Sequence, residues 1–245
     1  MLLSILCIFI SLLWALSEFW YFPELLPQKL TFNNFLNFAL NSYYSLANTI
    51  FIAISVSVLC CLTILLWLEI TYLINFNNKF LELFFFIPLL IPELSFLIGI
   101  NYFLVSSKII GSYVSLIFIE MLYVLPYTYL IIEPSFRKIN YSYIHLAKTF
   151  QKSNFEIFFK IRLPLITRAI FLSFSVGVLI SIGLYTPVYF IGDGQISTLS
   201  TDIINLSFSG SRKDLGVSTV IQMALPTLVL ILFFFISKRF IKWQY

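Results

Sequence analysis

The sequence predicts an all-α, polytopic membrane protein with about six transmembrane helices. Hydrophobic residues make up 60% of the 245 residues and charged residues only 11%. An ordinary soluble domain has roughly 25% charged residues, and so much apolar surface exposed to water would cause aggregation. Six apolar stretches approach the length of about 20 residues that a helix needs to cross a bilayer. Lipid is therefore the expected solvent, and a water-soluble fold is disfavoured.

The six apolar stretches are separated by polar or basic segments. They occupy approximately residues 1–16, 43–68, 80–105, 109–132, 166–191 and 217–237. The first carries a possible cleavage pattern at Ala15-Leu16-Ser17, but no basic residue precedes it. A signal peptide normally has a basic amino-terminal region, so a retained helix is expected. We find no internal repeat and no low-complexity linker, so residues 1–245 are predicted to form a single transmembrane domain.

The loop charges predict how the helices are oriented. With the amino terminus inside the cell, the inner segments contain 11 of the 15 Lys and Arg residues. Lys and Arg are retained on the cytoplasmic side, so both termini are predicted to be cytoplasmic. The net charge of +4 lies in these loops and not on one basic patch, so no nucleic-acid partner is expected. Three cysteines lie within apolar stretches and indicate neither a disulfide framework nor a metal site.

One loop, at about residues 134–165, is longer and more basic than the others. Projected onto a single helix, Leu146, Phe150, Ile157 and Ile161 form an apolar stripe, opposite His145, Lys148, Lys152 and Glu156. Ser153 and Asn154 favour helix caps and predict a break between two short helices. Leu163-Pro164 is expected to end the segment, because proline lacks a backbone donor and restricts the residue before it.

Three interpretations of this loop remain open from the pattern alone. A basic amphipathic segment can lie flat on the anionic inner leaflet of the membrane. It can also dock into a groove of a partner protein, or it can be an ordinary packed loop.

The residues of the loop are similar to a known motif. The segment His145-Leu-Ala-Lys-Thr-Phe-Gln-Lys-Ser-Asn-Phe-Glu-Ile-Phe-Phe-Lys-Ile-Arg-Leu-Pro164 resembles the EAA loop of ABC importer permeases. That pattern reads Glu-Ala-Ala, three residues, Gly, nine residues, Ile, one residue, Leu-Pro. The matching positions are Ala147, Ile161, Leu163 and Pro164, and Phe155 and Phe158 stand where the family often has aromatic residues. The departures are His145 for Glu, Leu146 for Ala and Gln151 for Gly.

The flanking segments extend the resemblance over about residues 80–240. Residues 185–202 look like the end of the fifth helix and the outer loop in permeases of the thiamine, iron(III) and sulfate importer group. The segment Ile87-Pro-Leu-Leu-Ile-Pro92 looks like the proline-rich third helix of the same group. The resemblance therefore implies a type I ABC importer permease fold.

The resemblance also implies a function and a set of partners. Such permeases work in pairs in the bacterial inner membrane, with an identical or related second subunit, a cytoplasmic ATPase dimer and an extracytoplasmic solute-binding protein. Each inserts its loop into a groove of the ATPase, which couples ATP-driven motion to the substrate path. The coupling contacts implied here are Ala147, Gln151, Ser153, Phe155, Phe158, Ile161, Leu163 and Pro164. Lys148 and Lys152 are expected to face solvent or lipid headgroups.

The chain is not expected to be an enzyme. It contains no Gly-x-x-x-x-Gly-Lys-Ser/Thr phosphate loop, so ATP is expected to bind to the partner and no cofactor to bind to this chain. His145 is the only histidine and has no second metal ligand nearby in the sequence. An ion-gradient transporter or an integral membrane enzyme remains the alternative. The first often contains internal repeats, and the second needs a cluster of polar catalytic residues.

Polar residues within the apolar stretches give candidates for the substrate path. Charged groups in the bilayer are costly and usually functional. Glu93 and Glu120 are the deepest, and with Ser181 they are predicted to line the path, where carboxylates would suit a cationic or amine-bearing solute. The alternative is that each carboxylate is hydrogen-bonded to a neighbouring helix. The small residues Gly177 and Gly183 of the fifth stretch are explained first by close helix packing.

Overall fold

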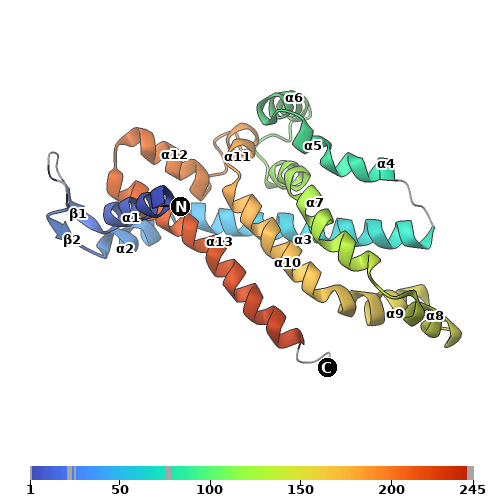
Figure 1. Ribbon diagram of the computed structural model, residues 1–245. Helices are drawn as coiled ribbons and strands as arrows, with labels where there is room; N and C mark the ends of the chain where they lie inside the picture. The colour runs from blue at the N-terminus through green and yellow to red at the C-terminus, as the bar shows by residue number, and fades with distance from the viewer. Residues whose placement is uncertain (1, 21–23, 25, 75–78, 242–245) are drawn as a thin grey trace.

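The computed structural model describes residues 2–20, 24, 26–74 and 79–241, and these are mostly helical (Figure 1). The first half contains α1 (Leu2–Leu16), β1 (Ser17–Phe19), β2 (Lys29–Leu30), α2 (Asn33–Asn41), α3 (Tyr43–Leu73), α4 (Lys79–Glu82), the 3₁₀ turn η1 (Leu83–Phe86), α5 (Ile87–Leu90) and α6 (Glu93–Ser106). The second half contains α7 (Tyr113–Arg137), α8 (Tyr141–Thr149), α9 (Asn154–Ile157), the π-helical turn η2 (Phe158–Arg162), α10 (Leu163–Gly183), α11 (Thr186–Ile191), α12 (Leu199–Ser209) and α13 (Arg212–Ile241).

The prediction of an all-α polytopic membrane protein is confirmed. Among the described residues, four helical segments are long and apolar enough to cross a membrane singly: Tyr43–Leu73, Tyr113–Arg137, Asn154–Gly183 and Arg212–Phe233. Helix α1 has 15 residues, fewer than the roughly 20 that span a bilayer unaided. All six predicted apolar stretches coincide with helices, but they do not all form straight spans.

The third apolar stretch, residues 80–105, is sharply bent and does not form one straight helix. Segments Leu83–Leu90 and Glu93–Ser106 meet at 103° around Ile91 and Pro92, whose backbone is not helical. Proline has no N–H to continue the helix and disfavours the helical conformation at the residue before it. The two arms form either a broken span or a re-entrant loop, which brings the count of candidate spans in the described chain to five.

The fifth apolar stretch also differs from the prediction of one helix over residues 166–191. Helix α10 ends at Gly183, Leu184 is extended, and α11 begins at Thr186 with Pro187 in its first turn. A proline fits the first turn of a helix, where the missing N–H has no intrahelical partner. Pro187 therefore starts a new helix.

Helices α3, α7 and α10 form the centre of the molecule. One cluster joins α3 to α7 through buried residues such as Val56, Cys60 and Ile119. A second cluster adds α10 nearer the other end, through Ile64, Ile132 and Ile166. Because lipid tails are as apolar as these side chains, the helices associate through close packing and interhelical hydrogen bonds.

Gly177 lies where α10 approaches both α3 and α7. A Cβ atom at this position would lie 2.9 Å from Ser57 Oγ on α3 and 3.2 Å from Val124 Cγ1 on α7. Outside its own helical turn, no heavy atom of the described residues lies within 4 Å of a Cβ built at Gly183. Close packing therefore explains Gly177 but not Gly183.

We expect Gly177→Leu to lower the thermal stability of the purified protein, because the added side chain must push α10 away from its neighbours. Overpacking of this kind costs about 1–3 kcal/mol. Gly99→Leu is the matched control, since Gly99 lies in α6 with open space around it. Thermal unfolding in detergent, followed by size-exclusion chromatography, measures both. Equal shifts in the two midpoints would contradict the packing role of Gly177.

The amino-terminal elements form a cap at one end of the molecule. The β1–β2 hairpin, α1, α2 and α12 lie at the end opposite α8 and α9 (Figure 1). The buried Asn34 side chain donates to the carbonyls of Ala15 and Ser17, at 2.9 Å and 2.8 Å. A Cβ on Gly216 would lie 2.6 Å from the Ala15 nitrogen, so α13 approaches α1 closely there. These contacts fix α1 to α2 and α13.

Candidate functional site

The basic loop forms two short helices, α8 and α9, separated by residues 150–153. They lie beside the carboxyl-terminal ends of α3 and α7, away from the hairpin cap (Figure 1). The predicted break at Ser153 and Asn154 is confirmed, and its cause is a capping box. Ser153 Oγ accepts the Glu156 N–H at 3.2 Å, while the Glu156 carboxylate accepts the Ser153 N–H at 3.4 Å. This reciprocal pair satisfies two backbone donors at the start of α9.

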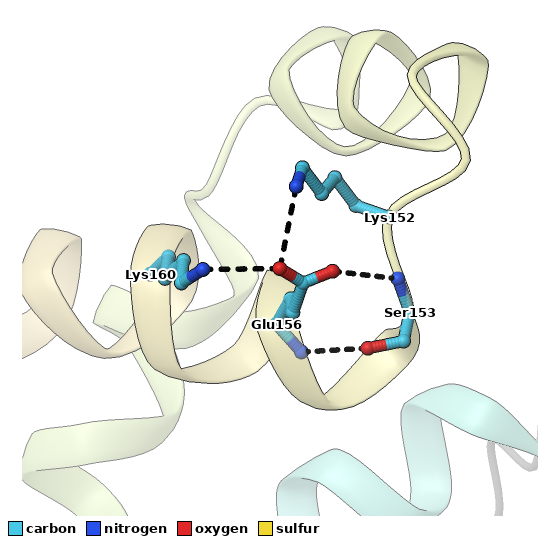
Figure 2. A network of polar contacts seen from close by, with 4 residues as sticks. All are labelled: Lys152, Ser153, Glu156 and Lys160. Atoms are coloured by element: carbon cyan, nitrogen blue, oxygen red, sulfur yellow. Dashed lines mark hydrogen bonds and ion pairs between the residues drawn. The ribbon is translucent and has the colours of Figure 1, made fainter.

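Figure 2 shows that Glu156 also holds the two sides of the break together. Its Oε1 atom is 3.3 Å from Lys152 Nζ and 3.0 Å from Lys160 Nζ. Exposed pairs spaced four residues apart contribute only about 0.2–0.5 kcal/mol each. Their effect is local order: one carboxylate connects the turn before α9, its capping residue and the next helical turn.

Gln151 occupies the turn between the helices in the left-handed backbone conformation, with φ of +53°. Its N–H donates to the Lys148 carbonyl at 2.9 Å, and the Lys152 N–H donates to the Ala147 carbonyl at 3.2 Å. This conformation costs a side-chain-bearing residue roughly 1–2 kcal/mol, whereas glycine adopts it freely. The turn that the glycine of the EAA pattern would ease is therefore formed here despite the glutamine.

We expect Gln151→Gly to make the loop more stable, because it removes the steric cost at φ +53°. The backbone entropy of glycine offsets about 0.5–1 kcal/mol of that gain. Hydrogen–deuterium exchange should show slower exchange of the amides of residues 146–157. Gln151→Val should accelerate it, since a β-branched side chain fits this conformation poorly. Lys148→Gly, inside α8, is the control for glycine itself and should also accelerate exchange. Faster exchange in Gln151→Gly would refute this account of the turn.

The predicted apolar stripe is wrong on α8. Leu146 and Phe150 are exposed, Phe150 by 74%, while Ile144 and Ala147 are buried against Ile157. The projection assumed one continuous helix. Because the chain breaks between α8 and α9, the side-chain directions of α9 do not continue the helical periodicity of α8. On the opposite face, the side chains of His145, Lys148 and Lys152 are exposed as predicted, whereas Glu156 is partly buried.

The predicted coupling residues separate into an outer and an inner group. Phe155 is 72% exposed, and its ring centroid lies 4.5 Å from that of Phe159. Gln151 and Ser153 are also exposed at the break. Ala147 is only 7% exposed and packs inside the loop's own core. The partly buried members are Phe158, Ile161, Leu163 and Pro164.

The expectation that Leu163-Pro164 ends the segment is wrong. Helix α9, η2 and α10 form one helical segment from Asn154 to Gly183. Pro164 is tolerated because the preceding turn is π-helical: the Leu163 N–H donates to the carbonyl of Phe158, five residues earlier. A wider turn leaves room for the proline ring, which would otherwise press on the preceding turn of an α-helix. The loop therefore continues into the membrane without a corner.

Arg162 is the main residue that sequence reasoning missed. It was counted among the loop charges, but its side chain is only 2% exposed. Its guanidinium forms an ion pair with Glu69 of α3 and lies 3.6 Å from the ring centroid of Tyr72. The ring of Phe136, at the end of α7, is 5.7 Å away. The sequence did contain one signal for this pair. Glu69 stands at the end of an apolar stretch, and a carboxylate that is buried there requires a cation as its partner.

Glu120 of α7 meets Ser181 of α10, so the alternative of a carboxylate hydrogen-bonded to a neighbouring helix holds for Glu120. Glu120 is 1% exposed, and its carboxylate accepts a hydrogen bond from the Ser181 hydroxyl on α10. They share a small pocket with Thr49, Ile52, Ile182, Leu184, Val188, Thr198 and Ser200. Glu93 is not among these residues; it opens α6, just after the Pro92 bend, and is partly exposed.

Hydroxyl groups surround the pocket of Glu120. Ser200 Oγ donates to the Ile182 carbonyl at 3.0 Å and accepts from Gln222 Nε2 at 3.1 Å. Thr49 Oγ1 accepts the Leu199 N–H at 2.9 Å. These bonds join α3, α10, α12 and α13 to one another near the buried carboxylate of α7, so the pocket lies at a polar junction of these helices.

The basic loop and most of the residues around Glu120 lie in a region that is similar to known proteins. The family described as the binding-protein-dependent transport system inner membrane component matches residues 71–242. The inner membrane ABC transporter permease protein YnjC of Escherichia coli (strain K12) is 28% identical over 194 residues, which is 79% of this chain. The alignment covers 37% of that relative, so the chain spans little more than a third of its length.

Proposed function

Since the chain belongs to the family of binding-protein-dependent transport system inner membrane components, we propose that it is half of an ATP-driven importer, coupled to a separate cytoplasmic ATPase. Family membership makes it a transmembrane subunit of an ABC transporter and a multi-pass inner membrane protein. The direction of transport, the coupling and the partners are our proposal.

One observation carries the proposal: α8 and α9 form an ordered projection with exposed aromatic side chains. The break between them is fixed by the Ser153–Glu156 capping box, and Phe150 and Phe155 point away from the loop core, as their exposure indicates. A short helix that presents apolar anchors fits a groove of a partner protein. Aromatic anchors in such grooves supply much of the binding energy.

The partners follow from this role. An ATPase dimer would bind two such loops, one from this chain and one from a second permease subunit that is identical or related. An extracytoplasmic solute-binding protein would deliver the solute at the hairpin end. This arrangement requires α8, α9 and both termini to be cytoplasmic, which is the orientation that the loop charges favour.

The polar junction around Glu120 is proposed to form part of the substrate path. A buried carboxylate flanked by the hydroxyls of Ser181, Thr198 and Ser200 suits a cationic or amine-bearing solute. Because each subunit would line one side of the path, the second subunit would complete it.

The test is purification of the complex through an affinity tag on this chain. We expect an ATPase to be recovered with it and vanadate to inhibit the ATP hydrolysis of the complex. Scrambling residues 146–157 should remove the ATPase while the tagged protein still elutes as a single species. If the ATPase is retained equally after scrambling, docking through this loop is wrong.

The direction of transport needs a separate measurement. A strain that lacks this gene should fail to deplete one compound from a defined growth medium, as shown by metabolite profiling. Restoration by the intact gene, but not by the scrambled variant, would support import. Accumulation of the compound inside the deletion strain would indicate export and contradict the proposal.

A further inference from the structure

The joint between the loop and the membrane helices contains a buried charge cluster that the proposed function leaves unexplained. Arg162 belongs to the most basic loop of the chain, and Lys160, two residues earlier, has a side chain that is 70% exposed. The side chain of Arg162 is instead only 2% exposed. Removing a guanidinium from water is costly unless its surroundings compensate, so the local backbone must direct it inward for a structural or functional reason.

The π-helical turn explains how Arg162 reaches the interior. In an α-helix, a residue five positions after Ile157 would lie about 140° round the axis from it. Ile157 is buried, so that geometry would turn Arg162 outward. The wider π-helical turn of Phe158–Arg162 brings Arg162 back toward the face of Ile157. Ile166, the next buried residue of α10, lies one turn after Arg162.

Arg162 then meets two residues of α3, one helical turn apart. Its Nη1 atom pairs with Glu69 Oε2, and its guanidinium lies over the ring of Tyr72 at 3.6 Å from the centroid. A planar, delocalised cation can pair with a carboxylate at its edge and stack on a ring with its face, which an ammonium cannot do. Both contacts therefore depend on the orientation of the guanidinium plane.

Tyr72 links this cluster to α8. The same side chain packs against the core that Ile144, Ala147 and Ile157 form between α8 and α9. The ring thus has the loop core on one side and the Arg162 guanidinium against it. A displacement of α8 must move Tyr72, and with it the end of α3.

Net stability does not account for this cluster. A buried ion pair is often no more stabilising than apolar residues of similar size. Arg162 Nε also lacks a hydrogen-bond partner within the described part of the chain, which adds a cost. The cluster instead fixes the orientation of α3, α8 and the helical segment that contains Arg162 relative to one another.

We propose that Arg162, Glu69 and Tyr72 form the joint through which a displacement of α8 and α9 reaches α3. This inference rests on the proposed docking of an ATPase to the loop. In it, Arg162 is a positioning residue: it holds the loop in register with the membrane helices, and it does not itself contact nucleotide or solute.

The test measures movement of α3 in the intact complex and needs no knowledge of the solute. The native cysteines are replaced (Cys7→Ala, Cys60→Ala, Cys61→Ala), and Ala47→Cys places one reporter in the first turns of α3, where Ala47 is exposed. Its rate of reaction with a maleimide is compared between the nucleotide-free complex and the complex trapped with ATP and vanadate. In the otherwise unchanged complex, we expect the rate to change at least threefold.

Three variants decide the matter. Arg162→Gln and Tyr72→Leu should abolish the nucleotide-dependent change while the ATPase stays bound. Lys160→Gln should preserve it, because within the described residues the ion pair of Lys160 is with Glu156, at the surface. If Arg162→Gln fails to accumulate, Arg162→Lys replaces it: the ion pair can persist but the stacking cannot, and we expect less than half of the change to remain.

The outcomes separate this inference from the proposed function. A full rate change in Arg162→Gln or Arg162→Lys, with ATPase bound, would overturn the joint and leave the docking proposal intact. A complex that contains no ATPase before any joint residue is changed would overturn both. The variants could also lose thermal stability but keep the nucleotide-dependent change in maleimide reaction rate. That result would refute the joint and show that the cluster only stabilises the packing.

Discussion

Phe155→Ala is expected to weaken association of the ATPase with the membrane subunit about thirtyfold, which corresponds to about 2 kcal/mol. Phe155 is 72% exposed in this chain, so a partner that covers it would bury most of the ring. Its position two residues after the Ser153 cap, in the first turn of α9, fixes the backbone that presents it. An aromatic side chain on a rigid backbone loses little entropy on binding, which is why such residues dominate interfaces.

The measurement is the dissociation constant of the ATPase for the detergent-purified subunit, determined by fluorescence titration. Phe208→Ala is the matched control. Phe208 is 86% exposed and lies on α12, at the opposite end of the molecule (Figure 1). The control should bind the ATPase as tightly as the unmodified chain. Equal weakening by both substitutions would show that Phe155 acts through general destabilisation and not as an anchor.

Ser181→Ala is expected to reduce the free energy of unfolding by about 1–3 kcal/mol, because it leaves a buried carboxylate without a donor. The Ser181 hydroxyl donates to Glu120, whose side chain is almost inaccessible. The bond joins α10 to α7 across the centre of the helical bundle. Its loss therefore affects helix association, whereas a hydroxyl bonded within one helix would not.

Ser175→Ala supplies that comparison on the same helix. Ser175 is also buried, but its hydroxyl donates to the Phe171 carbonyl of α10 itself, at 2.8 Å. Thermal unfolding in lipid nanodiscs should show a clearly lower midpoint for Ser181→Ala than for Ser175→Ala. In Ser181→Ala/Glu120→Leu, which removes both partners, much of the stability should return. If the double variant is less stable than Ser181→Ala alone, the interhelical bond is not the cause.

The helical architecture was largely predictable from the sequence, and the reason is physical. In lipid every backbone polar group must be satisfied within the protein, so a long apolar stretch has few alternatives to a helix. The apolar stretches at residues 43–68 and 109–132 therefore became α3 and α7, with both carboxyl-terminal ends extended and the start of α7 moved to Tyr113. Hydropathy carries no information on direction, so neither the 103° angle at Pro92 nor the short helix that starts at Thr186 follows from the apolar stretches alone.

The candidate site was predicted less completely, for reasons that concern helical phase. The capping residues Ser153 and Glu156 act over three positions, and such local chemistry is visible in the sequence. The exposure of Phe150 and the burial of Arg162 depend on where one helix stops and how wide the next turn is. Neither the left-handed Gln151 nor the π-helical turn has a reliable sequence signature. A charge in a basic loop is normally solvated, so Arg162 gave no sign of its partner on α3.

The unbroken course of the chain from Asn154 to Gly183 has a mechanical consequence. Ser181 lies 19 residues beyond Arg162, a rise of about 28 Å along the axis. If the helical segment Asn154–Gly183 pivots at Arg162, a rotation of about 5° displaces Ser181 sideways by roughly 2.5 Å, given that rise. Such a swing exceeds the tolerance of a hydrogen bond, so a small rotation at the loop end of this helix would separate Ser181 from Glu120 and open the polar junction.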